Sequence, residues 1–351
     1  MHFAFTGQQI EFRDTVRRVL ARECTTDDLR AAFAAPTART ARWATLAELG
    51  VVGLSVPEAH GGLGLGLLDL VLLLEEAGRV ALPEPLMATS ALAAPLLGDL
   101  EGAGPAGATR VRSWLEEIAA GSITAAVGPP PGCPAPVAGA VGADLLVLTT
   151  PGPEDGPEVH VVEAGAAEVR PITSLDPTRR LGAVTWEPTA DTRLASGSRA
   201  ASTILATSDR AAVATAAELL GVTDRMVVMA ADYAKERKQF GRPIGAFQAV
   251  KHLLAGAEVK LEFARPLVYG AAWALDQGAP DASRSASAAK ACASDAAVEA
   301  ARVSLQVHGA VGYTWESDLH LFLKRAWALS EAWGSAAEHR RRVLASLLAP
   351  A

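Results

Sequence analysis

The sequence predicts an α+β fold in three parts: an N-terminal helical domain over 1–120, a small middle β-barrel or β-sandwich over 121–200, and a C-terminal four-helix bundle over 201–351. Two observations support this prediction. Apolar residues recur at helical spacing through both ends of the chain. Between them, short β-type runs alternate with proline and glycine, which is typical of a compact antiparallel β domain. A chain of 351 residues also exceeds a typical single core.

The N-terminal part is expected to be helical throughout. Thr6 and Gln9 fit a capping box, in which the Thr6 hydroxyl accepts from the amide of residue 9 and Gln9 returns to the amide of Thr6. A strongly apolar helix follows over 67–77, and two more helices are expected over 86–120. The glycine-rich loop over 60–66 could cradle a phosphate, but no Lys or Ser/Thr follows at P-loop spacing. We therefore interpret that loop as a connection between core helices.

The middle part contains the expected strands. Proline and glycine cluster over 128–132 and 151–157, where they separate short runs of β-forming residues. These runs are Ile123–Val127, Leu145–Thr149, Val159–Glu163 and Val184–Glu187.

After residue 200 the pattern returns to helix. The first helix, over 204–229, carries four apolar residues at steps of four, three and seven: Val213, Ala217, Leu220 and Val227. Alanine-rich helices are expected over 258–277 and 282–305, and a last helix over 319–347. Long helices joined by short turns predict an antiparallel bundle. The alanine content, together with arginine outnumbering lysine, suggests a GC-rich genome such as those of actinobacteria.

Composition excludes several classes of protein. No uninterrupted apolar run of about 18 residues occurs, so we expect no membrane span, and residues 8–13 are too polar for a signal peptide. The formal net charge of −7 argues against a nucleic-acid-binding surface. The three cysteines, Cys24, Cys133 and Cys292, lie far apart without metal-ligand spacing. We expect a reduced, cytoplasmic protein with no metal site.

The most informative stretch is Tyr233–His252, YAKERKQFGRPIGAFQAVKH. Gly241 and Pro243 break the preceding helix, and a second helix is expected to start nearby. The break places Arg237 and Gln239 on a turn, where a guanidinium fork and an amide match phosphate oxygens. The alternative is a charged helix end followed by a loop without a ligand.

Three stretches, in order along the chain, resemble signatures of the acyl-CoA dehydrogenase family. They are LSVPEAHGGLG with EEAGRVALPEPL (Leu54–Gly64, Glu75–Leu86), ERKQFGRPIGAFQAVKH (236–252), and QVHGAVGYTWESDLHLFLKR (Gln306–Arg325). The resemblance spans most of the chain and implies an acyl-CoA dehydrogenase-like fold. It also implies an FAD-dependent oxidoreductase of lipid metabolism that dehydrogenates the α,β bond of an acyl-CoA or related acyl thioester and passes electrons to an electron-transfer flavoprotein.

The resemblance further implies that the two C-terminal motifs form an FAD cradle, largely for a neighbouring subunit. The residues carried over are Arg237, Gln239, Phe240, Ile244, Phe247 and Gln248 in one part, and Gln306, Val307, Gly309 and Ala310 in the other. Ala310 stands where the family usually has a second glycine, and its methyl group would crowd a close backbone approach. Because such a cradle serves a neighbour, we expect a dimer or a dimer of dimers.

The catalytic base implied by the resemblance is missing. Removing a proton α to a thioester carbonyl needs a carboxylate of near-neutral pKa in an apolar pocket. At one family position this chain has Trp333, within Ala332–Ala336, and at the other it has Ala211. The remaining carboxylates, each more readily interpreted as solvated or structural, are Asp209, Glu218, Glu316 and Glu331.

The middle part of the chain departs from the family pattern. The family's T-E-x-x-x-G-S-D-like segment, which contacts the flavin and the acyl-CoA, is replaced by PPPGCPAPVAG over 129–139. Only SLDPTRRL, over Ser174–Leu181, is similar to a segment of short bacterial members.

Two features of the C-terminal motif are interpreted as structural. We interpret His308 as a structural residue. We interpret Glu316–His320 as the start of a helix, where the charge of Asp318 favours the helix N-terminus, rather than as a set of metal ligands.

Three functions stay open at this point. The first is a flavin-dependent acyl-thioester dehydrogenase with an unrecognised base. The second is a non-catalytic subunit of an α2β2 heterotetramer, which keeps half of a shared FAD cradle while another family chain supplies the base. The third is a diverged enzyme that acts on an unusual or carrier-bound thioester.

Overall fold

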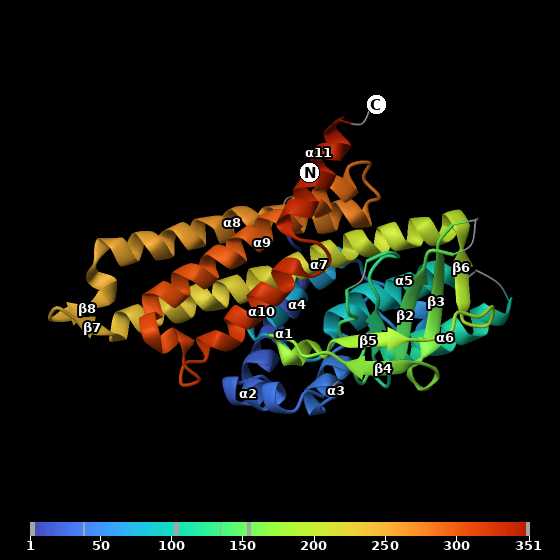
Figure 1. Ribbon diagram of the computed structural model, residues 1–351, viewed down its shortest axis with the longest axis horizontal. Helices are drawn as coiled ribbons and strands as arrows, with labels where there is room; N and C mark the ends of the chain where they lie inside the picture. The colour runs from blue at the N-terminus through green and yellow to red at the C-terminus, as the bar shows by residue number, and fades with distance from the viewer. Residues whose placement is uncertain (1–3, 38, 102–104, 134, 153–155, 349–351) are drawn as a thin grey trace. The chain divides into compact units, whose positions relative to one another are not determined.

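The computed structural model describes residues 4–37, 39–101, 105–133, 135–152 and 156–348 (Figure 1). They form two compact units, each discontinuous in sequence. Unit 1 comprises Met1–Arg30, Val71–Leu82 and Ala212–Ala351, and unit 2 comprises Ala31–Leu70 and Pro83–Ala211. Three helices continue from one unit into the other: α2 (Thr26–Ala34), α4 (Leu67–Arg79) and α7 (Gly197–Glu236). The domain boundaries at 120 and 200 stay a prediction.

Unit 1 is helical. Its N-terminal helix α1 (Gly7–Glu23) has the predicted capping box between Thr6 and Gln9, with both hydrogen bonds present. The bundle consists of the second part of α7 followed by four helices: α8 (Gln248–Asp276), α9 (Ala282–His308), α10 (Leu319–Glu331) and α11 (Ala336–Leu348). Helices α8 and α9 lie side by side along their length (Figure 1). The predicted core face of α7 is confirmed, because its four apolar residues are all buried.

The prediction of one closing helix over 319–347 is wrong. Trp333 and Gly334 adopt positive φ angles of 57° and 105°, which end the helical path between α10 and α11. Residue type did not signal this break, because tryptophan rarely adopts such a conformation. The start expected near Gly245 is close to the observed one, since a 3₁₀ turn over Ile244–Ala246 precedes α8.

Helices α4 and α7 cross in backbone contact within unit 1. A Cβ atom on Gly78 would lie 2.0 Å from the carbonyl oxygen of Glu218, and one on Gly221 would lie 1.8 Å from that of Glu75. Only glycine allows so close an approach, so these two glycines fix the crossing point.

Unit 2 contains the shorter helices and the β structure. Its helical elements are α3 (Ala41–Glu48), a π-helical segment (Met87–Ala93), α5 (Ala94–Leu100) and α6 (Pro105–Ala119). A four-stranded sheet has the order β1-β2-β3-β6, formed by Ala125–Val127, Leu145–Thr150, Glu158–Glu163 and Arg193–Ser196. A separate hairpin pairs β4 (Glu168–Pro171) with β5 (Gly182–Thr185).

The sheet and the hairpin share a small hydrophobic core, as the predicted sandwich requires. Leu146, Leu148 and Val162 of the sheet are buried in it, and Val169 and Trp186 on the hairpin side pack against it. The expectation of purely antiparallel pairing is wrong for β1 and β2, which are parallel. The segment 128–144 crosses over between them instead of forming a tight hairpin.

Two short connections complete unit 1. A hairpin of β7 (Lys238–Gln239) and β8 (Arg242–Pro243) joins α7 to α8, and a 3₁₀ turn over Gly309–Tyr313 follows α9. No helix in the described part of the chain is long and apolar enough to cross a membrane. Within the same residues, no group of three or more His, Cys, Asp or Glu side chains could hold a metal ion.

Candidate functional site

The two C-terminal sequence motifs meet in unit 1. Tyr233, near the end of α7, stacks on His308 at the end of α9, with ring centroids 4.5 Å apart and an interplanar angle of 18°. His308 Nδ1 donates to the carbonyl oxygen of Ser304 at 2.8 Å, and burial lowers the pKa of His308 below its usual value. A buried imidazole in these contacts supports its interpretation as a structural residue that joins the two motifs.

The β7–β8 hairpin presents its side chains to solvent. Phe240 has a φ of 54° and is 92% exposed, and Gly241 follows with a φ of 79°. The base of the hairpin is closed by a hydrogen bond from Ile244 N to Arg237 O at 2.7 Å. Arg242 lies over the ring of Phe247, 4.2 Å from its centroid, and the Phe240 ring contacts the same ring edge-on, with centroids 6.1 Å apart. The two contacts brace the turn, although most of the Phe240 side chain faces solvent.

The structure places most of the ten predicted cradle residues at the surface. Seven are exposed: Arg237, Gln239, Phe240, Gln248, Gln306, Gly309 and Ala310. Ile244 and Phe247 are half-buried, and Val307 is only 7% exposed. Val307 could therefore contribute through its backbone, because its side chain packs into the bundle.

These residues fit a phosphate-bearing dinucleotide. The Arg237 guanidinium and the amides of Gln239 and Gln306 are exposed donors for phosphate and nucleotide oxygens. Gly309 has φ 63° and ψ −143°, a conformation essentially restricted to glycine, and a Cβ there would meet nothing within 4 Å. The backbone at this turn is open, and the exposed Ala310 does not close it.

The surface beyond the α9 turn is aromatic. Tyr313 and Trp315 are exposed, Lys324 lies 4.2 Å above the Trp315 ring, and Trp315 contacts His320 edge-on. Asp318 precedes α10 but makes no side-chain cap; it pairs with Arg30 at 2.6 Å. Desolvation, with the positive charges of Lys324 and Arg30, lowers the pKa of His320 to about 4.

The turn between α10 and α11, where the resemblance places a base, has a fixed backbone and no carboxylate over 332–336. The ammonium of Lys290, on α9, donates to Ser330 O at 2.9 Å and to Gly334 O at 3.0 Å. His339 Nε2, on α11, donates to Trp333 O at 3.0 Å. Sequence reasoning missed Lys290, although it interrupts the alanine-rich face of α9 where a core residue is expected.

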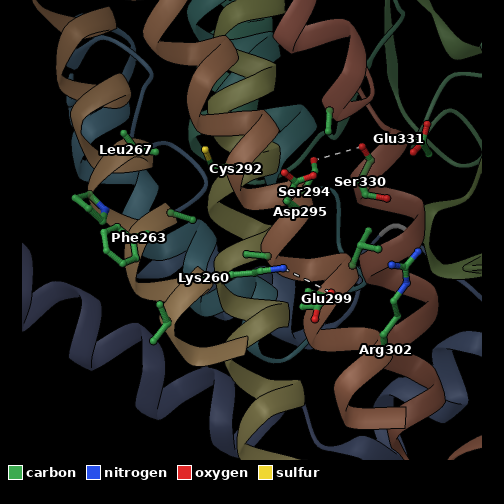
Figure 2. Close-up of a pocket in the computed structure, with 16 residues that line it drawn as sticks. Lys260, Phe263, Leu267, Cys292, Ser294, Asp295, Glu299, Arg302, Ser330 and Glu331 are labelled. Carbon is green, nitrogen blue, oxygen red and sulfur yellow. Dashed lines mark hydrogen bonds and ion pairs between the residues drawn. The ribbon is translucent and has the colours of Figure 1, made fainter. Parts of the chain in front are cut away.

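The other candidate bases are dispersed. Asp209 is buried on the part of α7 that belongs to unit 2. Glu218 is half-buried on α7 in unit 1, where its carbonyl packs on Gly78, and Glu331 and Glu316 are exposed. Glu331 lines a groove beside α8 and α9 (Figure 2). Their catalytic roles stay predictions.

One buried carboxylate with a shifted pKa was not among the sequence candidates. Glu75, on α4, is buried, and desolvation raises its pKa. One of its oxygens pairs with Arg265 and the other accepts from the Tyr269 hydroxyl, both on α8. A buried acid of raised pKa is a candidate base, but with both oxygens occupied Glu75 ties α4 to α8. The adjacent Glu75 and Glu76 in an otherwise apolar helix could have indicated a buried carboxylate from the sequence.

The segments of unit 2 that differ from the family pattern have structural roles. The loop 128–133 lines a cavity of about 320 Å³ together with Leu148 and Trp186, and the Thr149 hydroxyl donates to Pro129 O at 2.9 Å. Pro134, in the same predicted segment, lies outside the described residues. In SLDPTRRL, Asp176 caps a 3₁₀ turn, and burial lowers the pKa of Arg180 to about 10.

Comparison with known proteins agrees with this architecture. Residues 6–122 match the acyl-CoA dehydrogenase N-terminal domain and residues 197–348 match the acyl-CoA dehydrogenase C-terminal domain. The acyl-CoA dehydrogenase IpdE2 of Mycobacterium tuberculosis is 33% identical over 333 residues, which cover 94% of each chain.

Two solved structures show the same fold. A chain of the ChsE4–ChsE5 complex from Mycobacterium tuberculosis superposes with a TM-score of 0.87 at 24% identity, over 100% of both chains. Butyryl-CoA dehydrogenase from Megasphaera elsdenii gives 0.87 at 20% identity, over 99% of this chain and 100% of that one. With the motifs and the domain matches, these likenesses lead to one conclusion: the chain belongs to the acyl-CoA dehydrogenase family of FAD-dependent oxidoreductases.

Proposed function

We propose that this chain is one subunit of a hetero-oligomeric acyl-CoA dehydrogenase, in which a second family chain supplies the catalytic carboxylate. The observation that carries the proposal is the turn between α10 and α11, which has Trp333 at the position of the base. An indole is a hydrogen-bond donor without a basic nitrogen, so Trp333 cannot accept the α proton. The Lys290 and His339 contacts hold the turn in place without supplying that base.

The cradle, by contrast, retains its donors. Bound FAD supplies the acceptor for the β hydride, which no side chain can replace. On this chain, Arg237, Gln239 and Gln306 would hold the phosphate and adenosine portions of the cofactor. A subunit with a cradle and no base matches a division of labour between two chains, as in an α2β2 heterotetramer.

Helix α8 supports assembly because it is apolar on two faces. Its inner face is buried, for example at Leu261 and Val268. Its outer face is exposed and repeats at steps of three and four residues: Leu253, Gly256, Val259, Phe263, Leu267, Gly270 and Trp273. Exposed charged residues such as Lys251, Glu258 and Glu262 lie on the same helix, so the apolar residues form a stripe rather than a continuous surface. A contiguous exposed apolar stripe is typical of an interface, so a second subunit is expected to cover the outer face.

A groove lies beside this face. Figure 2 shows residues of α8 and α9 that line this groove, and Lys260 on α8 pairs with Glu299 on α9 at 3.6 Å. The groove has a volume of about 830 Å³, and Phe263 and Leu267 lie on its α8 side. Phe263 is 74% exposed, and a Cβ on Gly256 or Gly270 would meet nothing within 4 Å. An aromatic side chain beside a groove, flanked by small residues, suits a helix from another subunit.

The relatives are consistent with this assignment, since the ChsE4–ChsE5 structure is itself a complex of two different chains. We extend the proposal to an acyl-CoA or related acyl thioester as substrate, to an electron-transfer flavoprotein as electron acceptor of the assembled enzyme, and to a cytoplasmic location in lipid metabolism. A self-sufficient dehydrogenase with an unrecognised base, acting on an ordinary or a carrier-bound thioester, is the alternative.

The visible absorption spectrum tests the proposal. The chain should show no flavin bleaching by an acyl-CoA under anaerobic conditions when it is purified alone. Co-expression with a longer family chain that carries the glutamate should give a stable complex that contains flavin and is bleached. About one flavin per chain in the isolated protein, bleached by acyl-CoA, would overturn the proposal; substitution of Asp209, Glu218 and Glu331 would then locate the base.

A further inference from the structure

A fully buried lysine anchors the turn that lacks the base. Lys290 lies midway along α9 with 0% of its surface exposed. Its ammonium donates to Ser294 Oγ at 3.0 Å, to Ser330 O at 2.9 Å and to Gly334 O at 3.0 Å. An ammonium has three N–H donors, and these three acceptors lie on α9, at the end of α10 and in the turn itself. One side chain therefore connects three consecutive segments of unit 1.

A second buried side chain reaches the same turn from α11. His339 Nε2 donates to Trp333 O at 3.0 Å, and a Cβ on Gly334 would lie only 2.9 Å from that nitrogen. The carbonyl groups of residues 330, 333 and 334 are thus each held by a side chain from a neighbouring helix.

The backbone at Trp333 shows that this path is imposed. A bulky residue at a φ of 57° is uncommon because the conformation is strained. It persists only where the surroundings fix it. Lys290 and His339 are buried and donate to the carbonyl groups of residues 334 and 333, and buried Ser294 also donates to that of Ser330.

The Lys290 contacts also extend to the groove beside α8. Ser294 and Ser330 both line that groove, and Ser294 Oγ donates to Ser330 O at 3.4 Å, as the dashed line in Figure 2 marks. Two of the three residues that accept from Lys290 therefore line the groove beside the α8 face that we expect a second subunit to cover.

We propose that Lys290 and His339 are positioning residues that fix the backbone of residues 330–334 and so present the side chain of residue 333 in a single orientation. The identity of residue 333, and not the shape of the turn, then decides whether this chain supplies a base. The proposal takes from the proposed function only that Trp333 replaces the base; the positioning role does not depend on a partner chain.

Fluorine NMR of the chain labelled with 5-fluorotryptophan tests the orientation of residue 333. Trp333→Phe assigns its resonance among those of the seven tryptophans. Lys290→Met keeps the length of the side chain and removes its donors, so the Trp333 resonance should shift and broaden or split. Trp43 and Trp114 of unit 2 should keep their resonances, which shows that the chain is still folded.

The matched control is Ser287→Ala. Ser287 is buried on the same helix, and its hydroxyl has no hydrogen-bond partner within the described ranges. This substitution should leave the Trp333 resonance unchanged. A folded Lys290→Met protein with an unshifted, equally sharp Trp333 resonance would overturn the proposal, because the turn would then be fixed by other contacts.

Two measurements cover the case in which Lys290→Met does not fold. His339→Gln, which alters the contact with Trp333 O from α11, should also shift the Trp333 resonance. In the unaltered chain labelled with ¹⁵N-lysine, one ammonium group should exchange its protons far more slowly than the others and disappear in Lys290→Arg; uniformly fast exchange would contradict the three hydrogen bonds. None of these readouts involves flavin, substrate or a second chain, so their failure is separate from failure of the proposed function.

Discussion

Two turns in unit 1 have the same positive-φ backbone conformation but differ in their exposure to solvent and in the side chains that contact them. In each, an aromatic residue with positive φ precedes a glycine: Phe240–Gly241 in the β7–β8 hairpin and Trp333–Gly334 between α10 and α11. The hairpin matches the family motif and exposes its side chains. The second turn has Trp333 where the resemblance predicts a carboxylate, and two buried side chains contact its backbone.

The difference separates two kinds of constraint. Residues that contact a ligand must be exposed, so they can be read from a sequence motif and contribute little to packing. A turn that positions a catalytic group is held by buried side chains of neighbouring helices, which a sequence motif for the turn does not contain. In this chain the Lys290 contacts are present although residues 332–336 contain no carboxylate. The two turns should therefore respond differently to matched substitutions.

The largest difference is expected between Gly334→Ala and Gly241→Ala. At Gly334 the φ is 105°, and a Cβ would lie 2.9 Å from His339 Nε2; at Gly241 the φ is 79°, and a Cβ meets nothing within 4 Å. Gly334→Ala should lower the free energy of unfolding by about 2–4 kcal/mol, through backbone strain plus the displaced histidine. Gly241→Ala should cost about 1 kcal/mol, from strain alone.

Urea unfolding followed by tryptophan fluorescence measures both variants on the same chain. Equal losses would mean that the turn between α10 and α11 is no more constrained than the exposed hairpin. His339→Gln combined with Gly334→Ala serves as the control, because relieving the clash should recover part of the loss.

The next effect concerns the hairpin alone. Arg237→Ala should weaken FAD binding about tenfold, as expected for loss of a charge-assisted hydrogen bond, while the free energy of unfolding changes by less than about 0.5 kcal/mol. A flavin fluorescence titration of the assembled protein measures the affinity. Lys235→Ala is the control, since Lys235 is exposed two residues earlier and pairs with Asp232. A large loss of stability, or unchanged affinity, would show that Arg237 serves packing rather than the cofactor.

The helical architecture could be predicted from the sequence because helical periodicity persists along α7. The cradle residues come from the family motif, and their role stays a prediction, although seven of the ten are exposed. The resemblance placed a turn over 332–336, whereas the residue pattern alone predicted one helix over 319–347, because nothing in a tryptophan signals positive φ. The parallel pairing of β1 and β2 was missed because it depends on a crossover rather than on local pattern.

Lys290 and Val307 are two residues whose burial could not be predicted from the sequence. Lysine is almost always exposed, so a single lysine in a helix is not read as a buried anchor, although its neighbours on α9 are core alanines. Val307 was included in the cradle by its place in a motif, whereas the structure buries its side chain. Burial depends on which helix packs opposite, and a single sequence does not specify that.

The smallest effect is a pH dependence on the cradle side. The pKa values of His308 and His320 are both lowered, that of His320 to about 4, chiefly by desolvation. The unfolded chain therefore binds more protons than the folded one as the pH falls below 6.5, so stability decreases between about pH 6.5 and pH 4. His320→Gln should make the urea midpoint less dependent on pH across this window, with His308 and His160 retaining part of the slope. An unchanged slope in His320→Gln would contradict the prediction and would place the acid sensitivity at other groups, such as His308 and His160.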